Sequence, residues 1–196
     1  AHRNLGRHQR IGRILRRLQR WSGADQPRTF PAGQLVFLPD GSHFFDSLFG
    51  ALAAAQSSIC LEYYIIKADR TGFRLAELLS AACNRGVKVC MIYDYIGCID
   101  TPESYFRALR SHGVQCIAFN PPPFRRGIHL FDRRDHRKLA IIDGSVAFLG
   151  GRHIGKEYAG ITGDTPLLHD VGFSFTGQAG QYLSQRFTEL RTLERG

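Results

Sequence analysis

The stretch from residue 59 to residue 95, ICLEYYIIKADRTGFRLAELLSAACNRGVKVCMIYDY, decides the fold class. Its first part, Ile59–Ile66, is rich in β-branched and aromatic residues and therefore predicts a strand. Phe73–Asn84 has helical spacing and ends at Arg85-Gly86, a basic last turn followed by a glycine stop. Val87–Tyr95 is almost continuously apolar and predicts a second, buried strand. A strand, a helix and a strand in this order predict a right-handed β-α-β crossover.

The same alternation continues on both sides of this unit. A pair of short strands joined at Gly144-Ser145 has the pattern of a hairpin. The remaining expected strands are 34–38, 114–119, 139–143, 146–149 and 169–175, and the remaining expected helices are 44–55, 101–111 and 182–193. The pattern predicts one α/β domain over residues 34–196, with a mixed, mostly parallel sheet and helices on both faces.

Residues 1–33 form a separate basic segment. Seven arginines and no acidic residue occur in the first 21 positions, although the net charge of the whole chain is only +9. An apolar stripe at helical spacing, formed by Ile11, Ile14, Leu15, Leu18 and Trp21, predicts a basic amphipathic helix. Two interpretations stay open: an interfacial helix on an anionic membrane surface, or a helix packed on the protein body. Residues 22–33 have the composition of a linker.

Length and cysteine content exclude several classes of protein. A chain of 196 residues is long enough for one well-packed domain, and no run approaches the ~20 apolar residues that span a bilayer. The five cysteines show neither C-x-x-C nor Cys/His metal spacing. We therefore expect no disulfide framework and no metal site, and a reducing, cytosol-facing compartment.

The residues that carry chemistry lie in the segment 134–151, RDHRKLAIIDGSVAFLGG. Residues i and i+2 of a strand point to the same face, so His136 and Lys138 are expected to project side by side. The imidazole can attack phosphorus, and the ammonium can stabilise charge on the non-bridging oxygens. Asp143 can make a charge-assisted contact that fixes neighbouring polar groups. Gly150-Gly151 allows a close approach of the backbone.

Each of these residues alone has an ordinary structural explanation, because single histidines are usually structural and single lysines usually lie on the surface. The complete string H-x-K-x4-D-x6-G-G, on a strand that follows an arginine-rich loop, is much more specific. We therefore interpret it as a functional site whose imidazole and ammonium suit attack on a phosphate ester.

This string resembles the HKD motif of the phospholipase D superfamily. The resemblance covers roughly residues 34–196 and is strongest to the N-terminal half of bacterial cardiolipin synthases. Its supporting segments are Asp40-Gly41 with the following helix, LEYYII at 61–66, RGVKV at 85–89, Gly113-Val114, FNP at 119–121, RRDHRK at 133–138, and LHDV at 168–171 with Gly177.

The resemblance implies a phospholipase D-like half and a role for each motif residue. His136 would form a covalent phosphohistidine, Lys138 would bind the phosphate, and Asp143 would be the acid of the motif. Asp170 falls where the family has a carboxylate that orients the imidazole through Nδ1, although a surface acid at a strand edge is the plainer interpretation. We expect no metal and no cofactor, because the sequence has no Asp/Glu/His cluster with ligand spacing and His136 with Lys138 supplies nucleophile and electrophile.

Two departures from the family pattern matter. The family usually has Asn two residues after the glycine pair, and this chain has His153 there, beside Gly150 and Gly151 as candidate substrate-binding residues. The family's site also needs two facing motifs, and the sequence contains one. We expect the second HKD half to come from a C-terminal continuation of the chain or from a homodimer mate about a two-fold axis.

The loop from residue 121 to residue 135 mixes apolar side chains with arginines, including the candidate substrate-binding residues Arg133 and Arg134. Acyl chains with phosphate headgroups would suit this mixture, nucleic acid would suit it less, and a partly disordered basic loop is the third alternative.

The sequence therefore predicts a cardiolipin synthase-type phosphatidyltransferase acting on phosphatidylglycerol or a similar phospholipid, peripheral on the cytoplasmic face of a bacterial inner membrane. Phospholipase D activity, a homodimeric single-motif nuclease and an inactive docking module are the alternatives.

Overall fold

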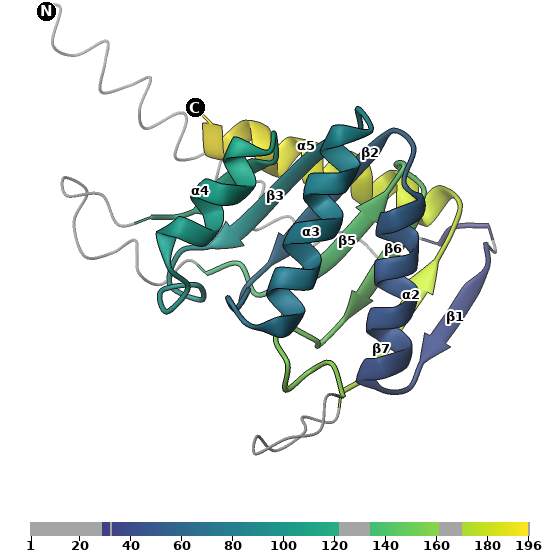
Figure 1. Ribbon diagram of the computed structural model, residues 1–196. Coiled ribbons are helices and arrows are strands. Elements are labelled where there is room, and N and C mark those ends of the chain that lie inside the picture. Colours follow the sequence, from purple (N-terminus) through teal and green to yellow (C-terminus); the bar gives the residue numbers. More distant parts are fainter. Residues whose placement is uncertain (1–28, 32, 122–133, 161–169, 196) are drawn as a thin grey trace, which may run out of the picture. The chain divides into compact units, whose positions relative to one another are not determined.

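The computed structural model describes residues 29–31, 33–121, 134–160 and 170–195 (Figure 1). The chain separates into two units, residues 1–31 and 32–196, and the description below concerns the second. The amphipathic helix expected near the N-terminus lies outside the described residues, and so do Arg133 and most of the basic loop. The division into residues 1–33 and 34–196 stays a prediction.

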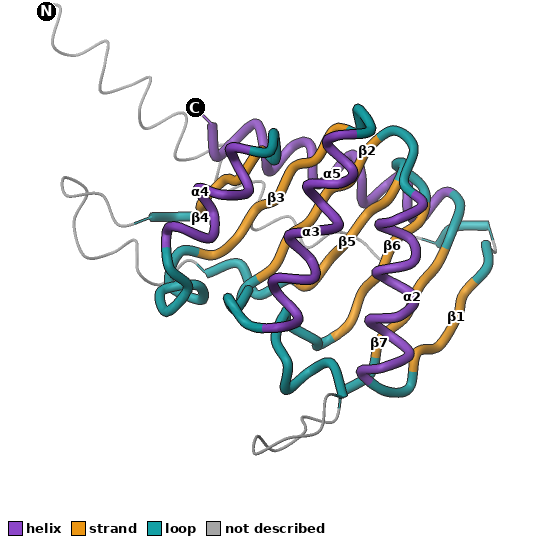
Figure 2. Tube along the Cα trace, in the orientation of Figure 1, coloured by secondary structure: helices purple, strands orange, loops and turns teal. Residues whose placement is uncertain are grey.

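The core of the fold is a seven-stranded sheet with the order β1-β7-β6-β5-β2-β3-β4 (Figures 1 and 2). The strands are β1 (Leu35–Leu38), β2 (Ser58–Tyr63), β3 (Lys88–Asp94), β4 (Gln115–Phe119), β5 (Lys138–Ile142), β6 (Val146–Gly150) and β7 (Gly172–Phe175). The two strands of the sequence's central crossover, β2 and β3, are parallel neighbours, as predicted.

The sheet is mixed, as predicted, but it is not mostly parallel. Only β2–β3 and β3–β4 are parallel pairs, whereas β1–β7, β7–β6, β6–β5 and β5–β2 are antiparallel. A parallel pair needs a long crossover, and helices supply one on each side of β3. The short turn at residues 143–145 between β5 and β6 permits only an antiparallel pair.

Helices cover both faces of the sheet, as predicted. The helices α2 (Gly41–Ala54), α3 (Arg70–Asn84) and α4 (Glu103–Ser111) share one face, and α5 (Gln178–Arg195) lies on the other (Figure 1). The N-termini of α2 and α3 are capped by Asp40 and Asp69, whose carboxylates accept hydrogen bonds from backbone amides of the first turns.

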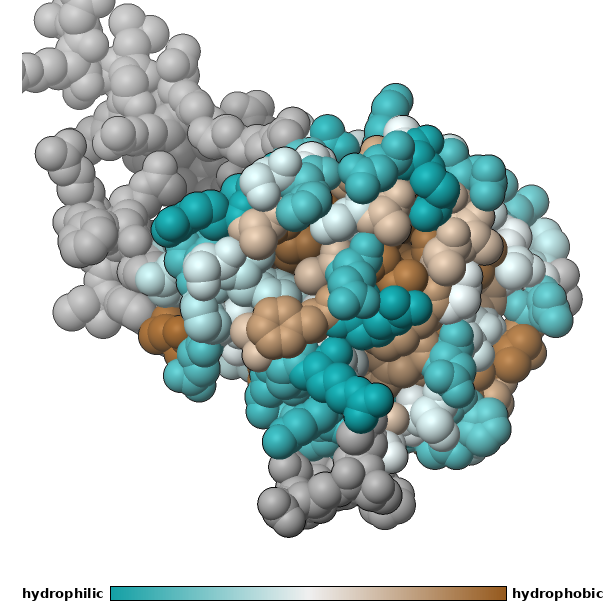
Figure 3. All heavy atoms as spheres, in the orientation of Figure 1, coloured by the Kyte–Doolittle hydropathy of each residue, from teal (hydrophilic) through white to brown (hydrophobic). Residues whose placement is uncertain are grey.

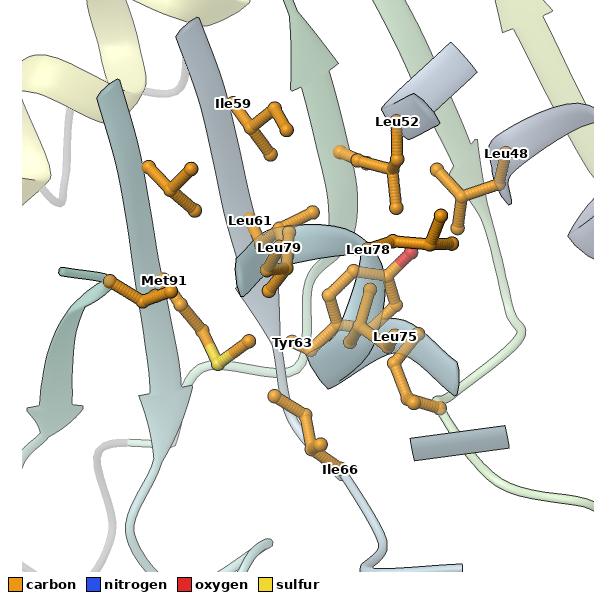
Figure 4. Packing of buried hydrophobic residues seen from close by; sticks show 14 of the residues in the cluster. Leu48, Leu52, Ile59, Leu61, Tyr63, Ile66, Leu75, Leu78, Leu79 and Met91 are labelled. Atoms are coloured by element: carbon orange, nitrogen blue, oxygen red, sulfur yellow. The ribbon is translucent and has the colours of Figure 1, made fainter. Parts of the chain in front are cut away.

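The alternation of side chains along β2 separates two apolar cores. Ile59, Leu61 and Tyr63 point towards the layer of α2 and α3, where Figure 4 shows them with Leu48, Leu52, Leu75, Leu78 and Leu79. Each fully buried side chain of this kind contributes about 1.5–3 kcal/mol. Cys60 points to the opposite face, against the α5 layer. Glu62 has the same parity as Cys60 and is therefore a buried acid on the α5 side.

Hydrophilic and apolar residues are interspersed over the face that Figure 3 shows. Among the described helices, none combines the length and the apolar character that crossing a bilayer requires.

Candidate functional site

The candidate site lies at the sheet edge where β2 and β3 end and β5 begins. Tyr63, the last residue of β2, is the register partner of Lys138, the first residue of β5. β6 ends at Gly150 and β7 begins at Gly172 on the same edge, because Gly150 and Gly172 are register partners. The antiparallel half of the sheet therefore brings the strand that follows His136 and the glycine pair to one edge.

His136 and Lys138 converge on one aromatic ring. The exposed imidazole of His136 stacks on Tyr64, with 3.8 Å between ring centroids and 21° between planes. The Lys138 ammonium lies 6.0 Å from the centre of the same ring, and Nζ donates to the His136 carbonyl oxygen at 2.6 Å. Burial lowers the pKa of Lys138, while Asp170 and Asp135 act in the opposite direction. The imidazole and the ammonium therefore lie near one ring, and their roles as nucleophile and phosphate-binding group stay predictions.

His153 adds a neutral hydrogen-bond donor to this edge. Its Nδ1 accepts from the backbone amide of Ile65 at 3.3 Å, so the neutral ring carries its proton on Nε2. Burial, helped by the neighbouring Lys138 and His136, lowers the pKa of His153 to about 4, against the opposing effects of Asp170 and Glu157. The ring lies 5.8 Å from Tyr64, centroid to centroid. His153 is therefore uncharged and able to donate at neutral pH.

Asp170 lies against the glycine pair. A Cβ atom on Gly151 would collide with the Asp170 carboxylate, so only glycine allows this approach. The charge of Asp170 raises the pKa of Lys138 and His153, which places it among the groups of the site. Its Oδ1 accepts from the amide of Val171 at 2.7 Å, and among the described residues no hydrogen bond joins it to His136. The orienting role of Asp170 stays a prediction.

Asp143 lies at the opposite end of β5 from Lys138, so a place among the catalytic groups is wrong. Its carboxylate accepts from the amides of Gln56, Ser57 and Ser58 at 2.7–3.2 Å and from the Ser57 hydroxyl at 2.8 Å. Burial acts to raise the pKa of Asp143, but these hydrogen bonds outweigh it and lower the pKa to about 2. The motif acid fixes the α2–β2 turn, which is the polar-group contact that its strand-end position predicts.

Of the two loop arginines predicted to bind substrate, the structure describes only Arg134. Arg133 lies outside the described residues. The Arg134 guanidinium lies mostly buried, 3.4 Å from Asp94 Oδ1, so it points into the body of the protein. A substrate contact for either arginine stays a prediction.

Sequence reasoning missed Tyr64, whose ring neighbours both histidines of the site. It also missed the buried acids Glu62 and Asp94. The sequence did contain a signal for Glu62, namely a single acid inside an apolar strand. Such an acid is rarely buried without a partner, so it could have indicated a buried polar contact. Tyr64 gave no such signal, since aromatic residues at strand ends usually belong to the core.

The described residues include no group of three or more His, Cys, Asp or Glu side chains suited to hold a metal ion. What the edge does present is an exposed imidazole, an adjacent ammonium and a neutral N–H donor. These are the groups that nucleophilic attack on a phosphate ester uses.

The chain is similar in sequence and in fold to known proteins. The family model for the cardiolipin synthase, PLD-like domain matches residues 48–158. The chain is 38% identical over 148 residues to the cardiolipin synthase of Oceanobacillus iheyensis, covering 76% of this chain and 31% of that protein. It is 35% identical over 187 residues to that of Alkalihalophilus pseudofirmus, covering 95% of this chain and 36% of that protein.

Among solved structures, NucT from Helicobacter pylori matches with a TM-score of 0.63 at 18% identity, covering 83% of this chain and 96% of that chain. This likeness confirms the α/β fold. The chain thus spans about a third of the length of the cardiolipin synthases that it matches. On the matched model and the identity to these relatives, the chain belongs to the family of cardiolipin synthases with a phospholipase D-like domain.

Proposed function

We propose that this chain supplies one half of a phosphatidyltransferase of the cardiolipin synthase type. The observation that carries the proposal is the pair His136 and Lys138 over Tyr64 in a chain whose relatives are cardiolipin synthases. The substrate would be a phospholipid such as phosphatidylglycerol, and the whole reaction would need a second HKD half.

In this proposal His136 attacks the phosphorus of phosphatidylglycerol, a bond from nitrogen to phosphorus forms, and the bond to the glycerol oxygen breaks. Lys138 and the Nε2–H of His153 hold the non-bridging oxygens, where charge develops in the transition state. The hydroxyl of a second phospholipid then attacks the phosphorus and releases the imidazole. A histidine from the second half would protonate the leaving glycerol and accept the proton of the incoming hydroxyl.

The second half has two possible sources. Relatives about three times as long favour a longer chain in which this segment is one part. The match to NucT over nearly its whole length favours a second candidate, a single-motif phosphodiesterase completed by a second copy of the chain. Phospholipid is the first substrate candidate for either assembly, and nucleic acid is the alternative.

Turnover of phosphatidylglycerol vesicles and of single-stranded DNA, each in excess EDTA, distinguishes these candidates. We expect cardiolipin and glycerol from the vesicles and no loss of rate in EDTA, because His136 and Lys138 provide both nucleophile and charge stabilisation. Phosphatidic acid as the main lipid product would indicate a hydrolase. Cleavage of DNA without turnover of lipid would reject the transferase.

Attachment to the cytoplasmic face of the inner membrane is also a proposal, supported by the lipid substrate of the relatives' named activity and by the basic first 21 residues. Sedimentation with vesicles containing phosphatidylglycerol tests it. We expect deletion of residues 1–21 to reduce binding, and unchanged binding would contradict the interfacial-helix interpretation.

The attack step can be measured separately with bis(p-nitrophenyl) phosphate, since nitrophenolate leaves without being protonated. In this assay we expect His153→Ala to lower the rate about tenfold to a hundredfold, because one donor to the non-bridging oxygens is lost. His153→Asn is the matched control, since its amide can accept from Ile65 and still donate. Equal losses in the two variants would contradict a donor role for His153.

A further inference from the structure

A cluster of buried carboxyl groups lies behind the segment that carries His136. Glu62, Asp94 and Asp135 are 1%, 0% and 5% exposed, respectively. Glu62 and Asp94 come from neighbouring strands, β2 and β3, and Asp135 immediately precedes His136 in the chain. Buried acids of this kind are costly unless each finds a partner, so their arrangement requires an explanation.

Two of the three acids hold the backbone on either side of His136. Asp94 is fixed at the end of β3 by the amides of Ile96 and Gly97, at 3.0 and 2.9 Å. Its other oxygen accepts from the amide of Asp135 at 3.0 Å. Asp135 in turn accepts from the amide of Arg137 at 3.2 Å. The residues before and after His136 therefore both depend on this cluster.

The third acid, Glu62, lacks hydrogen bonds when it is treated as a carboxylate. Neither of its oxygens has a hydrogen-bond partner, and the same is true of Asp135 Oδ2. The Nε atom of Arg137 lies 3.0 Å from Glu62 Oε1 and 3.2 Å from Asp135 Oδ1, as an ion-pair contact shared between the two acids. Because one Nε atom contacts both carboxyl groups, the side chains of Glu62 and Asp135 are close neighbours.

A proton on Glu62 accounts for these features together. A protonated Glu62 carboxyl can donate to Asp135 Oδ2, which gives a partner to both groups. The charges then balance, because the carboxylates of Asp94 and Asp135 face the guanidinium groups of Arg134 and Arg137. Burial and the neighbouring Asp135 together raise the pKa of Glu62 to about 9, against the opposing effect of Arg137.

The positions of Glu62 and Asp135 in the chain show which two segments a hydrogen bond between them would join. The backbone ladder between β2 and β5 ends at the register pair Tyr63 and Lys138. Beyond that point β2 leads to Tyr64, while the chain before β5 carries His136, and these two rings stack. Glu62 and Asp135 lie two residues before Tyr64 and one before His136, so a hydrogen bond between them ties the two ring-bearing segments together.

We propose that Glu62 is a protonated positioning residue, whose carboxyl donates to Asp135 and thereby holds the His136 imidazole over Tyr64. The proposal deepens the proposed function, on which its catalytic consequence rests. The charged groups that act on Glu62 are Asp135 and Arg137, with Asp94 and Arg134 completing the cluster. Helix α5 covers this face, and its Arg191 lowers the pKa of Cys60 but does not shift that of Glu62.

The test compares Glu62→Gln, which keeps a donor to Asp135 without an ionisable proton, with Glu62→Leu, which removes the donor. With bis(p-nitrophenyl) phosphate we expect Glu62→Leu to lose about a hundredfold in rate, the effect of a reacting group displaced by about 1 Å. We expect Glu62→Gln to stay near the wild-type rate at pH 7 and to fall less steeply than wild type near pH 9. The ionisation of Lys138 is common to both profiles and cancels in the comparison.

Two readouts do not depend on turnover. The His136 ring protons, assigned by their loss in His136→Ala, are expected to show the ring-current shift of Tyr64 in wild type and Glu62→Gln, but not in Glu62→Leu. Because the folded pKa of Glu62 is raised, its contribution to stability is complete below about pH 4.5 and is lost as the pH rises towards 9. The melting temperature of wild type minus that of Glu62→Gln is therefore expected to fall between pH 5 and pH 9.

A constant difference in melting temperature over that range would show that Glu62 is ionised and would overturn the proposal. An unchanged His136 ring-current shift in Glu62→Leu would overturn the positioning role. If both physical readouts behave as expected while wild type turns over no phosphodiester, the proposed function fails and the pairing of Glu62 with Asp135 stands.

Discussion

Replacing His136 by alanine is expected to lower the release of nitrophenolate from bis(p-nitrophenyl) phosphate at least about a thousandfold, as loss of a covalent nucleophile does in other enzymes. The imidazole is the only group at this edge, among the described residues, that is exposed, stacked on an aromatic ring and next to a lysine ammonium. Stopped-flow absorbance under single-turnover conditions measures the step directly.

The same experiment has an internal check on folding. His136 is exposed and precedes β5, so its removal deletes no core contact, and we expect the melting temperature to change by less than about 2 °C. The stability of the phosphoryl label on the protein, compared in acid and in base, tests the covalent step further. A phosphohistidine is hydrolysed in acid and persists in base. An alanine variant that kept the wild-type rate would reject every catalytic version of the proposed function.

The central crossover could be predicted from local patterns because each signal acts within a few residues. The apolar runs of β2 and β3 and the Gly86 stop of α3 all correspond to observed elements. The observed ends of these elements differ from the predicted ones for reasons that the local pattern did not show. The predicted strand to Ile66 ends at Tyr63, because beyond it the chain turns and Ile66 forms only an isolated bridge to Ile154.

The antiparallel half of the sheet could not be predicted in the same way. β1 pairs with β7 through Leu35 and Phe175, which are separated by almost the whole domain. No local turn or helix determines that pairing; it depends on how the strands pack against one another in the complete fold. The sequence therefore predicted these strands, and the antiparallel direction of β6 against β5 through their short turn, but not the directions of the other pairs.

The candidate site was predictable where spacing determines direction and unpredictable where packing does. The i, i+2 spacing of His136 and Lys138 is a property of extended backbone, and both groups do meet Tyr64. Motif membership alone suggested catalysis for Asp143, although five residues of strand take it to the far edge. The strand-end position was the better guide, because it predicts a contact with nearby backbone groups.

The second large effect is on stability, and it concerns Asp143. Replacing Asp143 by alanine is expected to destabilise the domain by about 2–4 kcal/mol, because three amides and one hydroxyl lose a charged acceptor. Part of this comes from the backbone, since Asp143 has φ of +50°, which alanine adopts at a cost of about 1 kcal/mol. The carboxylate is partly accessible to solvent, which limits the loss to this range. Thermal unfolding should show a decrease of about 5–10 °C.

The control and the pH dependence separate charge from backbone strain. Asp143→Asn accepts the positive φ and keeps one acceptor oxygen, so it is expected to lose less than the alanine variant. The folded pKa of Asp143 is depressed to about 2, so its contribution is present above the unfolded value near 3.8 and is lost as the pH falls from about 4 to about 2. The gap in melting temperature between wild type and Asp143→Asn should therefore close over that interval.

Because Asp143 lies at the end of β5 remote from Lys138, the folded fraction of both variants should release nitrophenolate at close to the wild-type rate. A loss of rate without a loss of stability would return Asp143 to the catalytic groups.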